Sequence, residues 1–182
     1  IKNNSDVTAC DISLKTDKTI FVLKANGRKV KAEIPLCGRF NVYNALAASA
    51  CAVSLGIPVE KIVRGIKNFK PQKKRMEILA LKNGIVVLND SYNANPASMR
   101  NAIENFVKIF YNRRKILVLG DMLELGRYEI DEHRKLGKFL YENKSADMVC
   151  TTGNLSKNIA ETAGGKWFKN TDKLSEYLKK NL

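Results

Sequence analysis

The sequence predicts an α/β fold, in which a mostly parallel sheet flanked by helices follows a β-hairpin and two helices. From residue 76 onward, short apolar runs alternate with stretches of helical periodicity, a pattern typical of parallel sheets covered by helices. Before residue 68, three strand-like runs are followed by two helical ones. This change of pattern predicts two domains, residues 1–72 and residues 73–182.

The first domain is expected to contain three strands and two helices, at residues 7–14, 19–24, 29–36, 41–55 and 58–66. Asn26-Gly27, between the second and third strands, favours a tight type I′ hairpin. Gly56 follows the first helix at the position where a left-handed residue commonly ends one. The segment 68–75, which contains Pro71 and no acidic residue, is the predicted linker.

The second domain is expected to alternate strands and helices. Strands are predicted at residues 76–81, 85–88, 115–119, 148–152 and 166–168, and helices at residues 97–111, 129–142, 155–163 and 171–182. Three of the strands end in polar or glycine-containing loops, at residues 89–91, 120–121 and 151–153. Right-handed crossovers would place these loops at one edge of the sheet, where we expect the functional face.

Composition narrows the class of protein. No apolar run approaches the roughly 18 to 20 residues that a membrane span needs. Four widely spaced cysteines without a nearby histidine suggest neither a zinc site nor a disulfide framework, so we expect buried, reduced thiols in a cytoplasmic protein. The formal charge of +14 attracts anionic partners. Because the chain begins with Ile1 and shows no leader, we interpret it as a piece of a longer protein.

The most informative motif is the polar run Asn89–Pro96, which lies between a predicted strand and a predicted helix. Ligands of open α/β sheets bind outside the carboxyl ends of strands, and free N–H groups at a helix start favour anionic or hydroxyl-bearing ligands. The alternative is a turn in which Asn95 or Asp90 merely caps the helix. The chain contains neither G-x-G-x-x-G nor a Walker-type loop, so a dinucleotide bound in the Rossmann manner is not expected.

Several motifs resemble the Mur ligase family in their order and spacing. They are G-R-F-N-V-Y-N-A-L-A-A-S-A at residues 38–50, R-M-E at 75–77, N-D-S-Y-N-A-N-P-A-S-M at 89–99 and L-G-D-M-L-E-L-G at 119–126. His133 and Gly137 follow them. The last two motifs are similar to the branch that adds D-alanyl-D-alanine to UDP-N-acetylmuramoyl-tripeptide, the MurF type.

This resemblance implies a three-domain ATP-dependent amide ligase. The chain would hold the last part of the central ATP-binding domain and a C-terminal Rossmann-like domain that lacks its last strand region. ATP would phosphorylate the terminal carboxylate of the tripeptide, and the amine of D-Ala-D-Ala would attack the acyl phosphate. The phosphate loop and the Mg²⁺ ligands would lie in the missing N-terminal and central-domain segments of the same protein.

The resemblance also implies three nucleotide-binding residues. Asn44 matches the asparagine that contacts the adenine ring, and an amide suits the donor and acceptor edges of that ring. Arg75 matches the arginine at the hinge that reaches the nucleotide. Asp90 matches the aspartate that accepts hydrogen bonds from the ribose hydroxyls. The alternatives are an interior helix asparagine for Asn44 and a solvated linker charge for Arg75. Domain closure about residues 68–75 would bring Arg75 and Asp90 onto ATP.

The remaining polar residues of the two loops would serve the substrates. The cleft near the nucleotide and the dipeptide would be lined by Ser91, Tyr92, Asn93 and Asn95. Either Asp121 or Glu124 would hold the dipeptide ammonium, with helix capping as the competing role of Asp121. His133 has only its family position in favour of a functional role, because a lone helical histidine is more often structural.

Two residues depart from the family pattern. Phe40 stands where the family usually has a histidine, and Asn89 replaces the first of two aspartates, while Asp90 is retained. These departures leave open a degenerate or partner-binding homologue. The basic clusters leave open a nucleic-acid-binding module, but no such module is recognisable. We expect neither nucleic acid nor a membrane among the partners.

Overall fold

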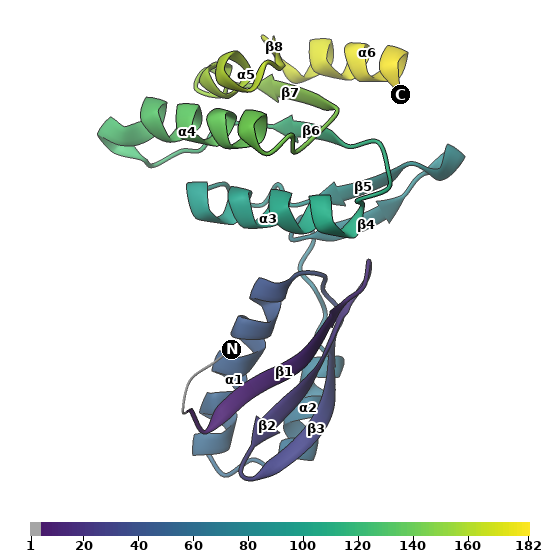
Figure 1. Cartoon of the computed structure of the whole chain (residues 1–182), viewed down its shortest axis with the longest axis vertical. Coiled ribbons are helices and arrows are strands. Elements are labelled where there is room, and N and C mark those ends of the chain that lie inside the picture. Colours follow the sequence, from purple (N-terminus) through teal and green to yellow (C-terminus); the bar gives the residue numbers. More distant parts are fainter. Residues whose placement is uncertain (1–4) are drawn as a thin grey trace. The chain divides into compact units, whose positions relative to one another are not determined.

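Figure 1 shows the computed structural model, which describes residues 5–182. The chain divides into two compact units, Ile1–Tyr92 and Asn93–Leu182. Each unit contains a buried hydrophobic cluster of its own. A separate core in each unit is typical of independently packed domains.

The first unit begins with an antiparallel sheet of three strands, β1 (Val7–Leu14), β2 (Thr19–Ala25) and β3 (Arg28–Ile34). Asn26 and Gly27 connect β2 to β3 with φ angles of 49° and 71°. Two successive positive φ angles characterise the type I′ turn, whose twist matches that of the flanking strands. The hairpin predicted from the Asn-Gly pair is confirmed.

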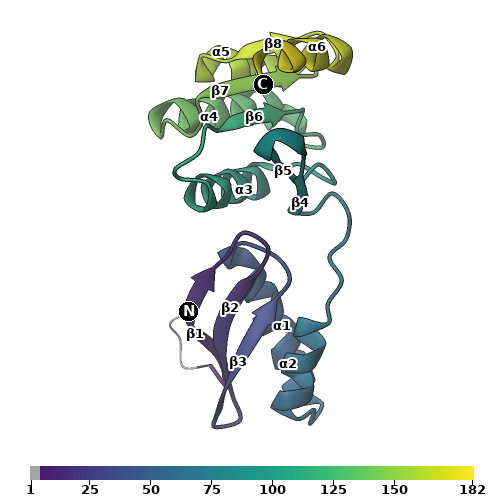
Figure 2. The same cartoon turned by 90° about the vertical axis from the view of Figure 1, so that its right-hand side faces the viewer.

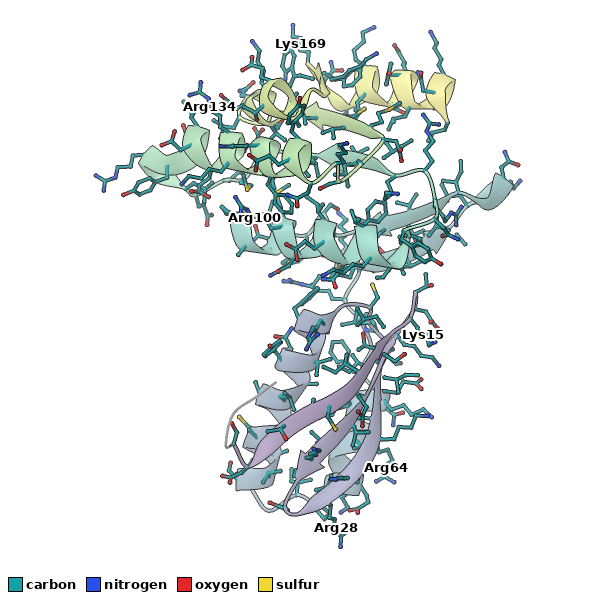
Figure 3. All side chains as sticks on the ribbon, viewed as in Figure 1. Lys15, Arg28, Arg64, Arg100, Arg134 and Lys169 are labelled. Atoms are coloured by element: carbon teal, nitrogen blue, oxygen red, sulfur yellow. The ribbon has the colours of Figure 1, made fainter. Side chains whose placement is uncertain are left out.

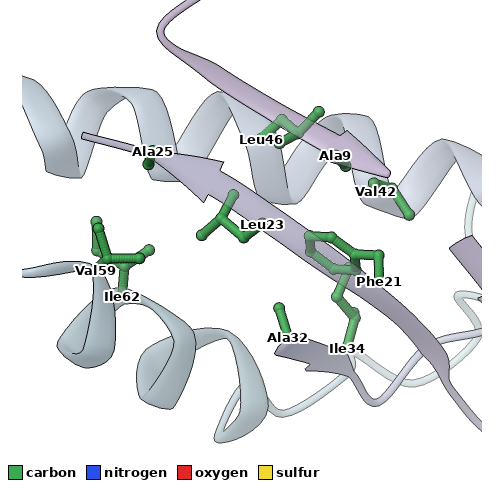
Figure 4. Close-up of a cluster of buried hydrophobic side chains, with 10 residues drawn as sticks. All are labelled: Ala9, Phe21, Leu23, Ala25, Ala32, Ile34, Val42, Leu46, Val59 and Ile62. Atoms are coloured by element: carbon green, nitrogen blue, oxygen red, sulfur yellow. The ribbon is translucent and has the colours of Figure 1, made fainter. Parts of the chain in front are cut away.

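Two helices, α1 (Arg39–Ser54) and α2 (Val59–Lys67), cover one face of this sheet (Figure 2). Phe21 and Leu23 of β2 are fully buried beneath them, because alternate side chains of a strand point to the same face. Burial of one such side chain contributes roughly 1.5–3 kcal/mol. Figure 4 shows the resulting core, which consists of Ala9, Phe21, Leu23, Ala25, Ala32, Ile34, Val42, Leu46, Val59 and Ile62.

The end of α1 follows the prediction from Gly56. Gly56 has a φ of 72°, and its N–H donates to the carbonyl of Val53 at 2.9 Å. The next N–H, of Ile57, donates to Ala52 at 3.0 Å. This pair of bonds is the Schellman arrangement, which satisfies carbonyls that the helix leaves free.

A second, two-stranded sheet in the first unit consists of β4 (Glu77–Ala80) and β5 (Val86–Asn89). The short 3₁₀ segment Lys82–Gly84 joins them, and Asn83 and Gly84 have φ angles of 63° and 75°. Both predicted strands are confirmed. They pair antiparallel, because so short a connection cannot make the crossover that parallel strands require.

The second unit contains a parallel sheet in the order β6 (Ile116–Leu119), β7 (Met148–Thr152) and β8 (Lys166–Phe168). Its helices are α3 (Pro96–Ile109), α4 (Glu129–Glu142), α5 (Lys157–Ala163) and α6 (Thr171–Asn181), with a 3₁₀ turn at Gly126–Tyr128. α4, β7 and β8 begin and end at the predicted residues.

Helices cover both faces of the parallel sheet. Val149 of β7 packs in one cluster with Leu136 of α4 and Ile159 of α5. On the opposite face, Tyr177 of α6 lies against Phe168 of β8, with ring centres 5.1 Å apart. A parallel sheet covered on both faces confirms the predicted fold class for this part of the chain.

Basic side chains are spread over both units, and Figure 3 labels six of them: Lys15, Arg28, Arg64, Arg100, Arg134 and Lys169. Arg28 forms an ion pair with Glu60 of α2. Arg100 of α3 lies over the ring of Phe139, 5.3 Å from its centre. Within residues 5–182, no helix is both long and apolar enough to cross a membrane.

The four cysteines are free thiols in different environments. Cys37 and Cys150 are buried, whereas Cys51 is exposed on α1. Burial raises the pKa of the Cys37 thiol to about 11, so this residue stays protonated at neutral pH. The prediction of buried thiols is therefore wrong for Cys51, because it lies on the side of α1 that faces away from the first core.

Candidate functional site

The end of the predicted linker lies against the loop that follows β5. Residues 69–76 form neither helix nor strand, and the pairing of Glu77 with Asn89 places this segment beside the loop. The Tyr92 N–H donates to the Lys74 carbonyl at 3.1 Å. The Arg75 guanidinium lies 4.0 Å from the centre of the Tyr92 ring, a cation–π distance. The structure thus brings Arg75 and Tyr92 together.

Asp90 also binds this segment. Its Oδ1 accepts a hydrogen bond from the backbone N–H of Met76 at 3.0 Å. Met76 and Lys74 have φ angles of 49° and 63°, a region that costs a residue with a side chain on the order of 1 kcal/mol or more. Asp90 therefore stabilises a strained backbone next to Arg75.

The Asp90 carboxyl is half-buried, and its electrostatics follow from that burial. Desolvation raises the pKa of Asp90, while the Met76 hydrogen bond and the positive charge of Arg75 act in the opposite direction. The ionised form is therefore less well solvated than in water. A ligand that donates hydroxyl hydrogen bonds to this carboxylate would replace the lost hydration.

The first residues of the loop form a turn of their own. Asn89 Oδ1 accepts from the N–H and the hydroxyl of Ser91, at 3.3 Å and 2.8 Å. The Asn89 amide also donates to Glu77 Oε2 at 3.4 Å. Asn89 thus orders the turn through hydrogen bonds that use both its donor and its acceptor. The Ser91 side chain is exposed.

Two further loop residues make local hydrogen bonds at the start of α3. Asn95 is the N-cap: its Oδ1 accepts from the Ser98 N–H at 2.8 Å, and the Ser98 hydroxyl accepts from the Asn95 N–H at 3.1 Å. Asn93 Oδ1 accepts from the Ala94 N–H at 2.8 Å. The capping role that the sequence left open is confirmed for Asn95, while Asp90 bonds to Met76 instead.

Asn44 lies on the exposed side of α1. Among the residues that the structure describes, its amide has no hydrogen-bond partner. One turn earlier, the buried Asn41 donates to the Cys37 carbonyl at 2.9 Å, so Asn41 is the structural asparagine of this helix. Within the part of the chain that the structure describes, no hydrogen bond or ion pair joins Asn44 to Arg75 or Asp90. The predicted contact of Asn44 with adenine stays a prediction.

In the second unit, the loops after β6 and β7 are joined by Asp121. Its Oδ1 accepts from the N–H groups of Leu155 and Ser156, at 3.1 Å and 2.7 Å. Glu124, three residues later, is exposed and has a φ of 63°. The two acidic residues that the sequence offered as alternatives therefore stand in different environments.

His133 of α4 is fully buried and uses both ring nitrogens. Its Nε2 accepts from the Met122 N–H at 2.9 Å, and its Nδ1 lies 2.6 Å from the Glu129 carbonyl, to which it donates. A neutral imidazole with the proton on Nδ1 satisfies both contacts. His133 thus fixes the loop after β6, which agrees with the structural alternative for a lone helical histidine.

Comparison with protein families agrees with the motifs. The profile of the Mur ligase glutamate ligase domain matches residues 74–182, and that of the Mur ligase middle domain matches residues 1–52. The chain belongs to the Mur ligase family.

Individual relatives are similar to the chain along nearly its whole length. The UDP-N-acetylmuramoyl-tripeptide--D-alanyl-D-alanine ligases of Buchnera aphidicola subsp. Baizongia pistaciae and Bacillus subtilis are each 36% identical to the chain, over 100% and 97% of its length. A crystal structure of MurF from Acinetobacter baumannii superposes with a TM-score of 0.86, at 30% identity over 97% of the chain. The chain spans 38–39% of the length of these proteins.

Two residues beside the predicted site residues of this Mur ligase chain were not predicted from the sequence to take part in the site. Met76 supplies the N–H that binds Asp90, and Gly153 provides the space beside Asp121. Both lie inside strings that the sequence singled out, R-M-E and the loop 151–153. An apolar side chain and a glycine carry no chemical signal of their own, because it is their backbone that acts.

Proposed function

We propose that the chain is the C-terminal part of an ATP-dependent ligase that adds D-alanyl-D-alanine to UDP-N-acetylmuramoyl-tripeptide in the cytoplasm. The observation that carries this proposal is the match to ligases of that name at 36% identity over the whole chain. Residues 1–72 would complete the central ATP-binding domain, and residues 73–182 would form the C-terminal domain. Both substrates would be bound together with other segments of the same protein.

The proposed reaction proceeds through an acyl phosphate. The γ-phosphoryl group of ATP is transferred to the terminal carboxylate of the tripeptide, which leaves ADP. The ammonium of D-Ala-D-Ala then loses a proton to solvent, and the free amine attacks the acyl carbon. The bond between this carbon and the bridging oxygen breaks, phosphate departs with that oxygen, and the new amide nitrogen loses its second proton to solvent. Such a reaction depends on charge neutralisation and on the alignment of two substrates more than on a covalent nucleophile.

Magnesium is the metal that this chemistry implies. Among residues 5–182 there is no group of three or more histidine, cysteine, aspartate or glutamate side chains that would hold a metal ion. In the proposal, the ligands of the metal belong to other segments of the protein. The described residues contact the nucleotide and the dipeptide.

Three residues are proposed to bind the nucleotide. Asp90 accepts hydrogen bonds from the ribose hydroxyls, which suits a half-buried carboxylate whose only described hydrogen bond comes from Met76. Arg75, exposed beside Asp90 and held over Tyr92, offers its guanidinium to ribose and phosphate oxygens. Asn44, exposed on α1, contacts the adenine ring.

The dipeptide is proposed to lie near exposed polar groups of the two loops. The loop after β5 contributes Ser91, Tyr92, Asn93 and Asn95, all of which are exposed. Asn93 and Asn95 retain their amide N–H groups for this purpose, because their recorded side-chain bonds use only Oδ1. One carboxylate of the loop after β6 receives the dipeptide ammonium.

The proposal is tested with the intact protein that carries these residues. We expect ADP release that requires both UDP-N-acetylmuramoyl-tripeptide and D-Ala-D-Ala, measured by a coupled spectrophotometric assay. The Asp90→Ala variant should raise the KM for ATP by roughly tenfold or more, because hydrogen bonds to a charged group contribute about 1.5–3 kcal/mol. ADP release without dependence on D-Ala-D-Ala would contradict the assignment.

The 182-residue chain alone provides a second test. We expect it to show no ligase turnover, because most phosphate contacts and the metal site of the proposal lie outside it. Measurable turnover by these residues alone would overturn the proposed partition of roles. Complementation of a cell that lacks its own ligase by the intact gene then separates an active enzyme from a degenerate homologue.

A further inference from the structure

The loops after β6 and β7 are joined by one carboxylate. Asp121 accepts two hydrogen bonds on Oδ1, from Leu155 at 3.1 Å and from Ser156 at 2.7 Å. Their donors lie 34 and 35 residues further along the chain. We call the set Asp121, Gly153, Leu155 and Ser156 the loop bridge.

The loop bridge depends on the absence of a side chain at residue 153. A Cβ placed on Gly153 would clash with Asp121 Oδ1, and it would lie 2.5 Å from Cγ and 2.7 Å from Oδ2. Both carboxylate oxygens of Asp121 thus lie close to Gly153. The backbone φ of Gly153, 117°, is also one that other residues rarely adopt. The carboxylate and the glycine form one packed unit.

Further hydrogen bonds are made by Gly153 and by Met122, the residue that follows Asp121. The Gly153 carbonyl accepts from the Trp167 indole N–H at 2.7 Å and from the Ser156 hydroxyl at 3.2 Å. The residue after Asp121, Met122, is fully buried and donates its N–H to His133. Asp121 is therefore bound to the loop after β7, and Met122 is bound to His133 of α4.

Glu124 differs from Asp121 in its exposure and in its hydrogen bonds. It is exposed, and it forms no hydrogen bond or ion pair with the residues that the structure describes. Its backbone lies in the left-handed region with a φ of 63°. Leu123 alone separates Glu124 from the fixed residues Asp121 and Met122, so the Glu124 backbone stays close to the loop bridge.

We infer that Asp121 is a positioning residue that holds the loop after β6, and that Glu124 supplies the carboxylate for the ammonium of the dipeptide. This inference rests on the proposed function, because it assigns the amine substrate to this loop. It decides between two carboxylates that the sequence left as alternatives. An ammonium pairs best with a carboxylate that is not already committed to backbone N–H groups.

Four variants of the intact protein separate the two roles by the KM for D-Ala-D-Ala. Glu124→Gln should raise this KM by roughly tenfold or more, as expected for a lost charge-assisted hydrogen bond. Asp121→Asn should raise it by less than about threefold, because an amide oxygen accepts the same two backbone bonds. Gly153→Ala should raise it by about tenfold, because the bridge opens while the charge of Asp121 remains.

Gly164→Ala is the matched control. Gly164 also has a positive φ, 67°, but a Cβ there would meet nothing within 4 Å. The control therefore carries the backbone strain of a glycine replacement without touching the bridge, and its KM should stay within about twofold of the unchanged protein. A KM for Asp121→Asn as high as that for Glu124→Gln would overturn the inference.

The integrity of the loop bridge can also be tested by measurements that do not require ligase activity. Trp167 is the single tryptophan of the 182-residue chain, and its indole bonds to the bridge. In this chain, Gly153→Ala should shift the tryptophan emission to longer wavelength and should speed amide hydrogen exchange at Leu155 and Ser156, whereas Asp121→Asn and Gly164→Ala should do neither. Unchanged exchange in Gly153→Ala would refute the bridge.

The two measurements separate the inference from the proposed function. If the intact protein shows no D-Ala-D-Ala-dependent turnover while Gly153→Ala speeds exchange at Leu155 and Ser156, the proposed function fails and the role of Asp121 as a positioning residue stands. If turnover is present and Gly153→Ala changes neither exchange nor KM, the inference fails and the proposed function stands.

Discussion

At the scale of single residues, Asp90 joins a structural and a proposed functional role. Its carboxylate holds the strained Met76 backbone, and burial raises its pKa in spite of Arg75. A raised pKa means that the folded chain binds the proton more tightly than the unfolded chain does. The charge on Asp90 therefore opposes folding at neutral pH, as is common for groups that a ligand later satisfies.

Replacement of Asp90 by asparagine tests this electrostatic cost. Below the unfolded aspartate pKa of about 3.9, both proteins are neutral at this position and should be similarly stable. As the pH rises through the raised folded pKa of Asp90, the wild-type chain alone loses stability, so Asp90→Asn should become the more stable of the two. Thermal unfolding between pH 3 and pH 8, roughly the range spanned by these protonation states, measures the difference.

The opposite pH trend would contradict the argument. If Asp90→Asn loses stability relative to the wild type as the pH rises, then the pKa of Asp90 is lowered in the folded chain, and its ionised form is stabilised by Arg75 and Met76. Glu104→Gln serves as control, because it removes the same charge from an exposed carboxyl on α3.

His133 is a second residue whose role depends on two contacts. Leucine at this position would leave the Met122 N–H without an acceptor in a buried site, at a cost of about 1–3 kcal/mol. Glutamine presents an amide oxygen at a similar reach, so His133→Gln should recover part of this loss. Urea unfolding of the two variants measures the free energies, and equal stability of both would show that the Met122 bond contributes nothing.

At the scale of the elements, α4 and α5 approach each other at a glycine. A Cβ on Gly137 of α4 would clash with Thr162 Oγ1 and would lie 2.6 Å from the Ile159 carbonyl. Thr162 and Ile159 belong to α5, whose backbone is fixed against the sheet through Ile159. The close contact of the two helices therefore requires glycine at this position.

Alanine at Gly137 should destabilise the second unit in spite of its better helix propensity. Overpacking in a filled core typically costs about 1–3 kcal/mol. Gly65→Ala in α2 is the matched control, because a Cβ there meets nothing within 4 Å, and it should stabilise by about 0.5–1 kcal/mol. If both replacements change the urea midpoint in the same direction, the helix contact at Gly137 is not as close as described.

At the scale of the whole molecule, the chain has two hydrophobic clusters with no residue in common. The first joins the β1–β3 sheet to α1 and α2, and the second joins β6 and β7 to α3, α4 and α5. Each cluster lies within one of the two compact units. Units that have their own cores are expected to unfold in separate steps.

Core replacements in the two clusters should therefore act on different transitions. Leu23→Ala and Leu140→Ala each remove a buried side chain, at a cost of about 2–5 kcal/mol. Calorimetry should show two transitions, of which Leu23→Ala lowers one and Leu140→Ala lowers the other. A single transition that both variants shift equally would show that the two cores unfold together.

The sequence by itself determined which segments form strands and helices, because the signals for them are local, although several elements begin or end one or two residues away from the predicted positions. Asn26-Gly27 predicted the hairpin turn, Gly56 the end of α1, and the run Asn89–Pro96 the loop that leads into α3. Each depends on residues within a few positions of one another, whose φ preferences and hydrogen bonds hold in any tertiary context. The run Asn89–Pro96 is also part of the motifs that resemble the Mur ligase family.

Only the tertiary structure decided what the polar side chains do. Asp90 bonds to a residue 14 positions away, His133 to one 11 positions away, and Asp121 to one 35 positions away. These partners are backbone N–H groups, which every residue except proline carries, so residue type cannot reveal which of them a side chain will meet. The folded backbone brings them together. It occupies Asp121 Oδ1 with two N–H groups of the same chain, while it leaves Glu124 exposed.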